Sequence, residues 1–365
     1  MRIALLGTRG IPARYGGFET FAEELSVRLV QRGHHVTVYC RAPHDTPAFQ
    51  GVRLVYIPPV RHKYMETVAH TFASTLHLLR HRAQFDAALY CNGANAIFTA
   101  LPRLAGIPTA INVDGLERKR KKWNMAARAW YLISEALSTF CPTEIITDAE
   151  NIQSYYRARY GADSTFIPYG APMGPIDPGE TLSALALQPR GYFLYVTRFE
   201  PENNPLLVRR AFESVHTDLK LALVGDAPYA ADYIAQVRDT KDPRVVLPGA
   251  IYGHGYHELQ ANSFAYIHAT EVGGTHPALI EAMGRGALVL YLKTRENEEV
   301  AGGAAIPFTG ELDLAAVIRR VLDMPDSQRD ALRLAAAERV RTRYSWDAVT
   351  SAYENLFSRL APQAQ

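Results

Sequence analysis

The sequence has few cysteines, no long apolar run and almost no net charge. Its three cysteines, Cys40, Cys91 and Cys141, lack metal-ligand spacing, and we expect buried, reduced thiols. The longest apolar runs have the length of strands, far short of a membrane span. A formal net charge of +2 gives no field that would select nucleic acid. Met1 is followed at once by a strand pattern, so we expect no secretory signal and a cytoplasmic location.

Several nucleotide-site and catalytic motifs are also missing. The chain has no Asp-x-Asp pair and no cluster of histidines and cysteines, so no metal site is expected. It has no G-x-G-x-x-G spacing, Walker loop, kinase signature or G-x-S-x-G elbow. The glycine spacing disfavours a nicotinamide dehydrogenase. A bound nucleotide diphosphate would have to be held by side chains and helix dipoles in place of a divalent cation.

Strand and helix patterns alternate in both halves of the chain. Short runs rich in β-branched and aromatic residues, such as HVTVYC and YFLYV, are separated by segments with helical spacing. This alternation indicates parallel sheets covered on both faces. Residues 171–190 collect proline and glycine and lose periodicity, as in a linker. We therefore expect an α/β protein with two Rossmann-like domains, 1–170 and 191–345, whose sheets face a cleft.

The first strand runs into a long glycine-rich loop, GTRGIPARYGG. Gly16 and Gly17 stand just before the first helix, whose free N–H groups and positive dipole end suit an anion. A turn that needs glycine for geometry alone is the alternative. So long a loop between a strand and a helix is uncommon unless it is functional, and we therefore favour contact with a ligand.

A second anion-ready helix start follows the strand segment SFAYIHA. Gly273, Gly274 and Thr275 turn the chain, and Pro277 suits the first turn of a helix. Glu281 lies one turn further on, on the same side, where a carboxylate would accept hydrogen bonds from a ribose diol. Diphosphate plus ribose is the outline of a nucleotide sugar. The alternative is an ordinary helix start with an exposed acid.

Charged residues follow two other strand segments. Arg198 comes after YFLYV, where its forked guanidinium suits phosphate unless a neighbouring glutamate pairs with it. Asp114 comes after TAINV and is followed by Glu117 and a basic run from Arg118 to Lys122. Such a run is usually a solvated face, and it also suits anions or an acidic membrane surface.

Together these segments resemble a glycosyltransferase of the GT-B fold, in the retaining family four, and above all its rhamnosyltransferase-like subgroup. GTRGIPARYGGFE, NVDGLE, RFEPENN and VGGTHPALIEAM occur in the order of that subgroup, and the resemblance covers nearly the whole chain. It implies an acceptor domain at the amino end and a nucleotide-sugar domain at the carboxyl end. It also implies that the final helix, 346–360, returns to the first domain.

The resemblance implies roles for the motif residues. Gly16 and Gly17 would touch the donor diphosphate or the transferred sugar. Arg198 matches the arginine of the family's G-R-x-x-x-x-K motif. Glu281 matches the last glutamate of its E-x7-E motif, which binds the ribose hydroxyls. The backbone of residues 273–275 would bind sugar and phosphate.

Four positions depart from the family pattern. Gly273 stands where most members have the first glutamate of E-x7-E, which contacts the transferred sugar, and Glu271 is an acid close by. Asn203 replaces the phosphate-binding lysine. Asp114 stands near the position at which many relatives have a sugar-facing histidine. Arg118 stands where the family pattern would place a tryptophan after NVDGLE. The first two departures are shared with the rhamnosyltransferase-like subgroup, which favours a deoxysugar such as L-rhamnose.

The expected reaction is retaining transfer of a sugar from a dTDP- or UDP-linked donor to a surface-glycan or lipid-linked saccharide, with no metal or other cofactor. Arg198 and the loop amides would stabilise charge on the phosphate, and Glu281 would orient the donor. We assign to Asp114 the orientation of sugar or acceptor, with Glu117 and Arg118 as acceptor-binding neighbours. A lipid-linked acceptor implies peripheral contact with the inner face of the cell membrane.

Two other functions fit part of the pattern. A nucleotide-sugar epimerase of GT-B type would need no acceptor, and the lack of an acid pair argues against it. A non-catalytic glycan- or nucleotide-binding subunit would account for Gly273 and Asn203. Against that, Arg198, Glu281 and both glycine loops are intact.

Overall fold

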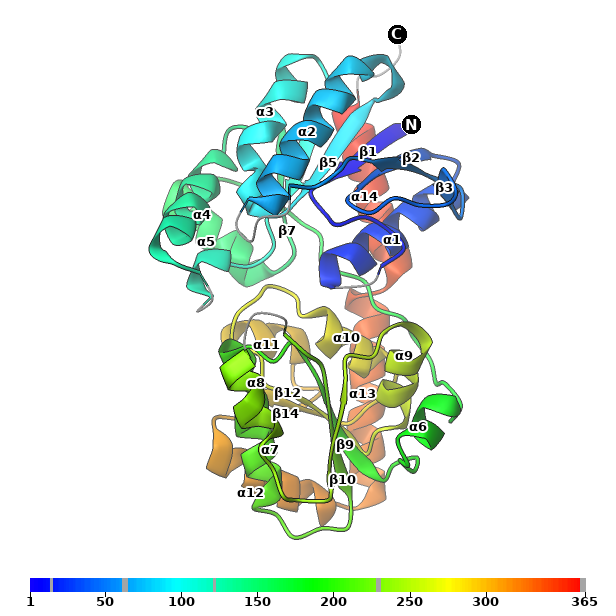
Figure 1. The fold of residues 1–365 in the computed structure, drawn as a ribbon, viewed down its shortest axis with the longest axis vertical. Helices are drawn as coiled ribbons and strands as arrows, with labels where there is room; N and C mark the ends of the chain where they lie inside the picture. Colours follow the sequence, from blue (N-terminus) through cyan, green and yellow to red (C-terminus); the bar gives the residue numbers. More distant parts are fainter. Residues whose placement is uncertain (14–15, 61–64, 121–122, 228–230, 362–365) are drawn as a thin grey trace. The chain divides into compact units, whose positions relative to one another are not determined.

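The structure of the protein is a computed structural model that describes residues 1–13, 16–60, 65–120, 123–227 and 231–361. The chain divides into two compact units. Unit 1 comprises Met1–Lys119, Trp123–Gly170 and Trp346–Gln365, and unit 2 is formed chiefly by Ala171–Ser345. Each unit is a layered α/β fold with its own sheet and core (Figure 1).

Unit 1 contains an eight-stranded sheet in the order β3-β4-β2-β1-β5-β6-β7-β8. Its strands are β1 (Arg2–Leu6), β2 (His35–Cys40), β3 (Ala48–Phe49), β4 (Val52–Tyr56), β5 (Ala87–Cys91), β6 (Thr109–Asn112), β7 (Glu144–Thr147) and β8 (Thr165–Phe166). All pairs are parallel except β3 with β4. That pair is a tight hairpin because Gln50 and Gly51 both have positive φ, the geometry of a two-residue turn.

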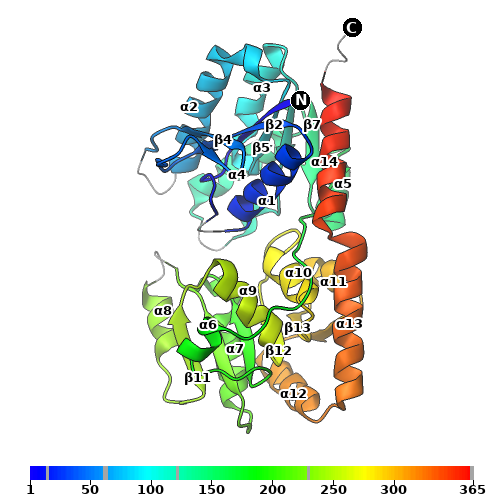
Figure 2. The same cartoon turned by 90° about the vertical axis from the view of Figure 1, so that its right-hand side faces the viewer.

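Helices cover both faces of this sheet. They are α1 (Gly17–Gln31), α2 (Glu66–Arg80), α3 (Ala96–Leu104), α4 (Met125–Leu137), α5 (Glu150–Tyr160) and α14 (Trp346–Leu360), with short 3₁₀ turns η1 (Arg82–Gln84), η2 (Gly93–Asn95) and η3 (Glu117–Lys119). Figure 2 shows α2 and α3 on one side of the sheet and α1 and α14 on the other. Helix α14 packs on α1, where the rings of Phe21 and Tyr353 lie 5.4 Å apart.

Unit 2 contains a six-stranded, wholly parallel sheet in the order β11-β10-β9-β12-β13-β14. Its strands are β9 (Tyr192–Val196), β10 (Lys220–Val224), β11 (Val245–Gly249), β12 (Ala265–His268), β13 (Val289–Leu292) and β14 (Ile306–Phe308). Its helices are α6 (Glu180–Ala184), α7 (Pro205–Glu213), α8 (Ala231–Arg238), α9 (Gly253–Asn262), α10 (Pro277–Gly284), α11 (Arg295–Ala301), α12 (Glu311–Leu322) and α13 (Asp326–Arg343), with the 3₁₀ turn η4 (Pro201–Asn203). Apolar side chains of α7, α8 and α12 bury one face of the sheet.

Residues 171–190, expected as a linker, lie in unit 2 and pack against it. They include α6, whose Leu182 is buried. Glu258 of α9 accepts hydrogen bonds from the amides of Gly179 at 2.8 Å and Leu182 at 3.0 Å. A side chain of α9 therefore caps the start of α6 and fixes this segment on the unit.

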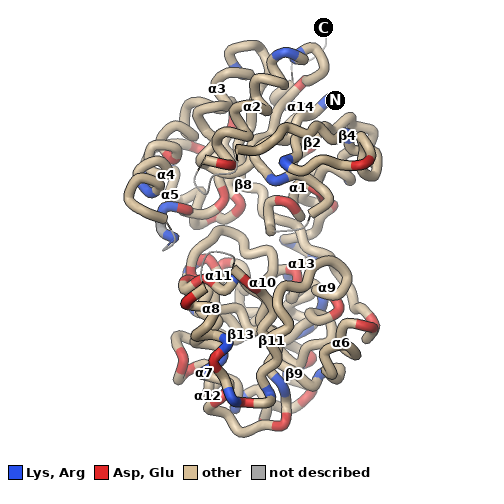
Figure 3. The backbone as a smooth tube through the Cα atoms, in the orientation of Figure 1, with Lys and Arg blue, Asp and Glu red and all other residues tan. Residues whose placement is uncertain are grey.

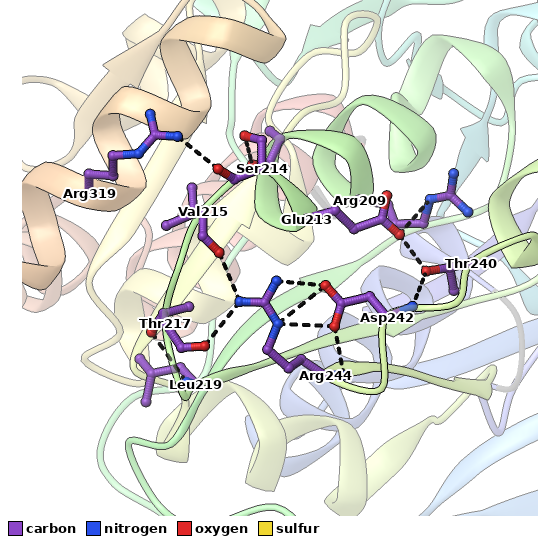
Figure 4. A network of polar contacts seen from close by, with 11 residues as sticks. Arg209, Glu213, Ser214, Val215, Thr217, Leu219, Thr240, Asp242, Arg244 and Arg319 are labelled. Carbon is purple, nitrogen blue, oxygen red and sulfur yellow. Dashed lines mark hydrogen bonds and ion pairs between the residues drawn. The ribbon is translucent and has the colours of Figure 1, made fainter.

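A polar network closes the amino-terminal edge of the unit 2 sheet (Figure 4). Arg244, one residue before β11, bonds the Asp242 carboxylate and donates to the carbonyls of Val215 at 2.8 Å and Thr217 at 3.0 Å. The guanidinium thus satisfies loop carbonyls at the edge opposite the strand carboxyl ends.

The predicted architecture of two Rossmann-like parallel sheets is confirmed. All three cysteines are free and buried. Over the described residues, no helix combines the length and apolar character needed to cross a membrane.

Candidate functional site

The second-half motifs meet at one edge of the unit 2 sheet. Strands β9 and β12 are parallel neighbours, so the chain leaves both at the same edge. Arg198 follows β9, and residues 273–275 follow β12 and lead into α10. Open parallel sheets bind ligands at this edge.

Hydrogen bonds fasten the two loops to each other. Asn204 has positive φ, and its Nδ2 donates to Ala269 O and to Glu271 Oε1, both at 3.0 Å. The amide of Glu271 donates to Glu202 O at 3.0 Å. Glu271, the acid near Gly273, therefore joins the two loops. These hydrogen bonds fix the position of the loop after β9 relative to the loop after β12.

The Arg198 guanidinium is held only loosely. Its side chain is 38% exposed, and the nearest carboxylate oxygen, Glu200 Oε1, is 4.0 Å away. Within the described part of the chain, the guanidinium makes no hydrogen bond. Asn203, at the family's lysine position, donates from Nδ2 to Arg198 O at 2.8 Å. Asn203 therefore fixes the backbone at Arg198, whose forked donors are available to an anion.

Glu281 is a buried carboxylate with a dedicated donor. Its exposed fraction is only 5%. The Tyr256 hydroxyl donates to Glu281 Oε2 at 2.5 Å, and Gln260 Nε2 donates to that hydroxyl at 2.8 Å. Burial, with the negative charge of Glu281, raises the pKa of Tyr256 well above its usual value, so the phenol stays protonated. This chain from α9 orients the carboxylate on α10.

Two buried histidines form a pair beside the GGTHP loop. His268 Nε2, at the end of β12, lies 2.6 Å from Nδ1 of His276, the N-cap of α10. Burial lowers the pKa of His276 to about 3 and that of His268 well below its usual value, so both rings are neutral near pH 7. One ring therefore donates and the other accepts. Their outer nitrogens, His268 Nδ1 and His276 Nε2, have no hydrogen-bond partner in the described residues.

The histidine pair explains the glycine at position 273. A Cβ on Gly273 would lie 2.3 Å from His276 Nε2, closer than real Cβ contacts allow. With the ring in place, no longer side chain fits there without displacement. The missing first glutamate of the E-x7-E pattern is therefore linked to His276.

In unit 1, two of the loop glycines are required by geometry. Gly7 and Gly10 have φ of +93° and +106°. Added Cβ atoms would lie 2.3 Å from Cys91 O and 2.6 Å from Cys40 Sγ, respectively. Here the alternative interpretation, a turn that needs glycine, is correct for these two positions.

The other glycines stand at the start of α1. Gly16 is the N-cap, in extended backbone conformation, and Gly17 is the first helical residue. The Glu19 carboxylate accepts from Arg9 N at 3.0 Å, and its other oxygen lies 3.3 Å from the site of a Cβ on Gly16. The Glu19 carboxylate therefore lies at the start of α1, where the sequence predicts that an anion binds.

A second acid of α1 folds the loop back onto the helix. Glu23 Oε2 accepts from Ala13 N at 2.6 Å, and burial raises the pKa of Glu23 above its usual value. The rest of the loop, residues 14–15, lies outside the described residues. Carboxylates of α1 therefore organise the described part of the loop.

Asp114 lies at the carboxyl edge of the unit 1 sheet. It adopts a positive φ of 54°, and its amide donates to Asn112 Oδ1 at 3.1 Å. Burial raises the pKa of the Cys91 thiol, and the charges of Glu19 and Asp114 both add to this rise. Both carboxylates therefore lie near the end of β5, so the glycine loop and Asp114 share one edge.

Arg118 and Glu117 are engaged in contacts within unit 1. Arg118 donates from Nε to Glu135 Oε1 and from Nη2 to Tyr155 OH, each at 2.8 Å. Glu117 Oε2 accepts from Trp123 Nε1 at 3.3 Å. These bonds tie η3 to α4 and α5, and acceptor binding by either residue stays a prediction. Residues 121–122 of the basic run lie outside the described residues.

The predicted site residues thus form two groups on different units. Arg198, residues 273–275 and Glu281 share one edge in unit 2. Gly16, Gly17 and Asp114 share one edge in unit 1.

Sequence reasoning missed several residues of these edges: Glu19, Glu202, Tyr256, His268 and His276. Glu202 is fully buried, and neither carboxylate oxygen has a hydrogen-bond partner in the described residues. The two histidines had a visible signal, since one ends a strand pattern and the other precedes the helix-starting proline. Nothing in the sequence joined Tyr256 to Glu281, because they lie on different helices.

Two glycosyltransferase profiles match the chain, one in each half. Residues 15–172 match the profile described as Glycosyltransferase Family 4, and residues 204–355 match one described as glycosyl transferase-like. A search of curated proteins found no match.

Solved structures share the fold over the whole chain. Sucrose-phosphate synthase from Thermosynechococcus elongatus has a TM-score of 0.79 at 20% identity, covering 98% of each chain. HepE of Anabaena, in complex with UDP and glucose, has a TM-score of 0.79 at 16% identity, covering 99% of this chain and all of the other. An α,α-trehalose-phosphate synthase (UDP-forming) from Burkholderia xenovorans has a TM-score of 0.75 at 11% identity, covering 98% and 100%. The two profile matches place glycosyltransferase sequence patterns in both halves of the chain, and the solved structures show that it has the GT-B fold.

Proposed function

We propose that the protein transfers L-rhamnose from a nucleoside diphosphate donor to a hydroxyl of a surface-glycan or lipid-linked saccharide. The observation that carries the proposal is the shared edge after β9 and β12. There a loosely held guanidinium at Arg198 follows β9, and a buried, oriented carboxylate at Glu281 lies on α10, the helix after the neighbouring parallel strand β12. A phosphate-binding cation beside a diol-binding anion matches a nucleotide sugar.

In the proposed reaction the anomeric configuration is retained. The bond between C1 of the sugar and the β-phosphate oxygen breaks, and the acceptor oxygen bonds to C1 on the same face. The acceptor proton passes to the departing phosphate oxygen. Arg198 and the amides at Gly17 and Gly274 stabilise the phosphate charge, and Glu281 holds the ribose hydroxyls. Asp114 orients the sugar or acceptor, with Glu117 and Arg118 as candidate acceptor contacts.

The sugar is proposed from the sequence pattern, and the structural neighbours point to a second donor. HepE was solved with UDP and with UDP-glucose. Gly273 supports a sugar other than the usual hexoses, because the family's acid cannot stand beside His276. Because HepE was solved with UDP-glucose, that donor is the alternative to dTDP-rhamnose. A lipid-linked acceptor would bring the enzyme to the inner face of the cell membrane.

The test uses both donors with and without acceptor. Purified protein is incubated with labelled dTDP-rhamnose or UDP-glucose, alone and with lipid-linked saccharides extracted from membranes. We expect label in the saccharide only when acceptor is present. Conversion of the donor without acceptor would indicate an epimerase. No change in either donor, despite a donor-induced rise in melting temperature, would indicate a binding subunit. Transfer to the acceptor from UDP-glucose but not from dTDP-rhamnose would reject the rhamnosyl assignment.

A further inference from the structure

Three neighbouring helices of unit 1 expose large apolar side chains, and the fully buried residues of one of them, α4, are polar. Helix α4 buries Ser134 and Glu135, whereas Met125 is 87% exposed and Ile133 is 54% exposed. An ordinary surface helix of a globular protein shows the opposite pattern. Glu135, ion-paired with Arg118, thus lies on the buried side of α4, while Leu132 and Ile133 lie on its exposed side.

The adjacent helices also expose large apolar side chains. Helix α3 buries Ala96, Thr99 and Pro102 and leaves Leu101 and Leu104 exposed, the latter to 85%. Helix α2 buries Leu78 with four polar residues, while Phe72 is exposed. Exposed apolar side chains therefore occur on three consecutive helices, which a single surface leucine would not explain.

The exposed apolar side chains belong to one continuous layer. Helix α3 packs against both α2 and α4. The rings of Phe72 and Phe98 lie 5.6 Å apart across α2 and α3. Arg103 of α3 donates to Phe140 O, just after α4, at 2.7 Å. We call this surface the outer apolar face and define it by Phe72, Leu101, Leu104, Leu132, Ile133 and Phe140.

Within α2, α3 and α4, the Asp, Glu, Lys and Arg residues that form no ion pair in the described structure are all arginines. Along α2 and α3 charged positions are few (Figure 3). The only acids of α2, α3 and α4 are Glu66, bonded to Arg41 at 3.1 Å, and Glu135, bonded to Arg118 at 2.8 Å. Arg80 and Arg128 are exposed.

We propose that the outer apolar face binds the surface of an anionic lipid bilayer, with its apolar side chains in the interface and the flanking arginines on lipid phosphates. Apolar side chains with basic residues around them are the signature of interfacial membrane binding. A second copy of the chain fits less well, because a symmetric contact would bring the same arginines together. The inference does not depend on which sugar the enzyme transfers.

Vesicle co-sedimentation of the full chain tests the proposal. We expect sedimentation with vesicles of phosphatidylcholine and phosphatidylglycerol, and much weaker sedimentation with phosphatidylcholine alone. Leu132→Ser/Ile133→Ser should reduce the partition coefficient roughly tenfold, since two apolar contacts are lost. The matched control is Leu312→Ser/Leu334→Ser, which changes two residues of unit 2 that are 87% and 71% exposed. This control should bind as wild type does.

A charge variant separates lipid binding from general adhesiveness. Arg128→Glu should weaken binding to anionic vesicles about fivefold or more, while Arg320→Glu, at an exposed site of α12, should not. Since all four variants change exposed residues, their melting temperatures should match wild type, which is checked first. Absence of sedimentation with anionic vesicles, or equal binding by the two double variants, would overturn the proposal. So would light scattering that shows a dimer in wild type and a monomer in Leu132→Ser/Ile133→Ser.

Discussion

His276 Nδ1 lies 2.6 Å from His268 Nε2, and the opposite nitrogen of His276 faces the place where a side chain at Gly273 would begin. This contact links a buried, neutral histidine pair to the loop that carries the nucleotide-sugar motif. It gives a physical reason for the glycine at a position where most of the resembled family has an acid.

The contact predicts that Gly273→Ala destabilises the protein. A methyl group 2.3 Å from His276 Nε2 must displace the ring or the loop, at a cost of about 1–3 kcal/mol. Urea denaturation would measure the loss. Gly310→Ala is the matched control, because nothing lies within 4 Å of the Cβ site at Gly310. In a His276→Ala background, Gly273→Ala should cost less. An equal cost in both backgrounds would show that the ring is not the obstacle.

The buried histidines predict a loss of stability in acid. His276 has a folded-state pKa of about 3, and His70 and His257 have values of about 4, below the ordinary value of the unfolded chain. As the pH falls below about 6.5, the unfolded state binds protons that the native state cannot, so stability falls. Each such histidine contributes up to about 1.4 kcal/mol per pH unit.

Denaturation at about pH 7.5 and about pH 5 would measure this effect. His276→Gln should reduce the pH dependence of the unfolding free energy, whereas His216→Gln, at an exposed site, should leave it unchanged. The same pH dependence in wild type and His276→Gln would contradict a neutral His276 in the fold.

Arg198→Ala should lose most turnover while remaining folded. Because the guanidinium is 38% exposed and its ion pair with Glu200 is 4.0 Å long, its removal breaks no hydrogen bond of the described structure. Loss of a donor to the leaving phosphate should lower kcat/KM about a hundredfold. Arg238→Ala removes an arginine that is 53% exposed and serves as control. A wild-type rate for Arg198→Ala would reject the phosphate assignment.

Tyr256→Phe should weaken donor binding. Removing the hydroxyl leaves Glu281 Oε2 without its 2.5 Å donor and should cost about 1–3 kcal/mol of stability. If Glu281 holds the ribose, KM for the donor should rise about tenfold and exceed any fall in kcat. Tyr56→Phe changes a phenol that is 45% exposed and should have neither effect. Unchanged nucleotide affinity in Tyr256→Phe would argue against the ribose role of Glu281.

Turnover should be insensitive to chelation. The described residues contain no group of three histidine, cysteine, aspartate or glutamate side chains placed to hold a metal ion. The proposed stabilisation of the diphosphate uses Arg198 and loop amides instead. Initial rates with and without an excess of EDTA would test this, and recovery of lost activity by added Mg²⁺ or Mn²⁺ would contradict it.

Local pattern was enough for the architecture. The predicted strands HVTVYC and YFLYV coincide with β2 and β9, and the predicted final helix, 346–360, coincides with α14. Periodicity reports which side of an element is buried, and this depends on residues only a few positions apart. The place of Arg198 and of residues 273–275 at strand ends followed in the same way.

Contacts between distant segments needed the tertiary structure. Tyr256 orients Glu281 from another helix, and Glu19 occupies the helix start at Gly16. The outer apolar face escaped notice because apolar spacing in α4 predicts a buried stripe, whereas packing buries its opposite, polar side. The sequence pattern specified which residues share a helix face or end a strand, since these are properties of neighbouring residues. Which face is covered, and which side chain meets another across loops, was decided by packing between segments far apart in the chain.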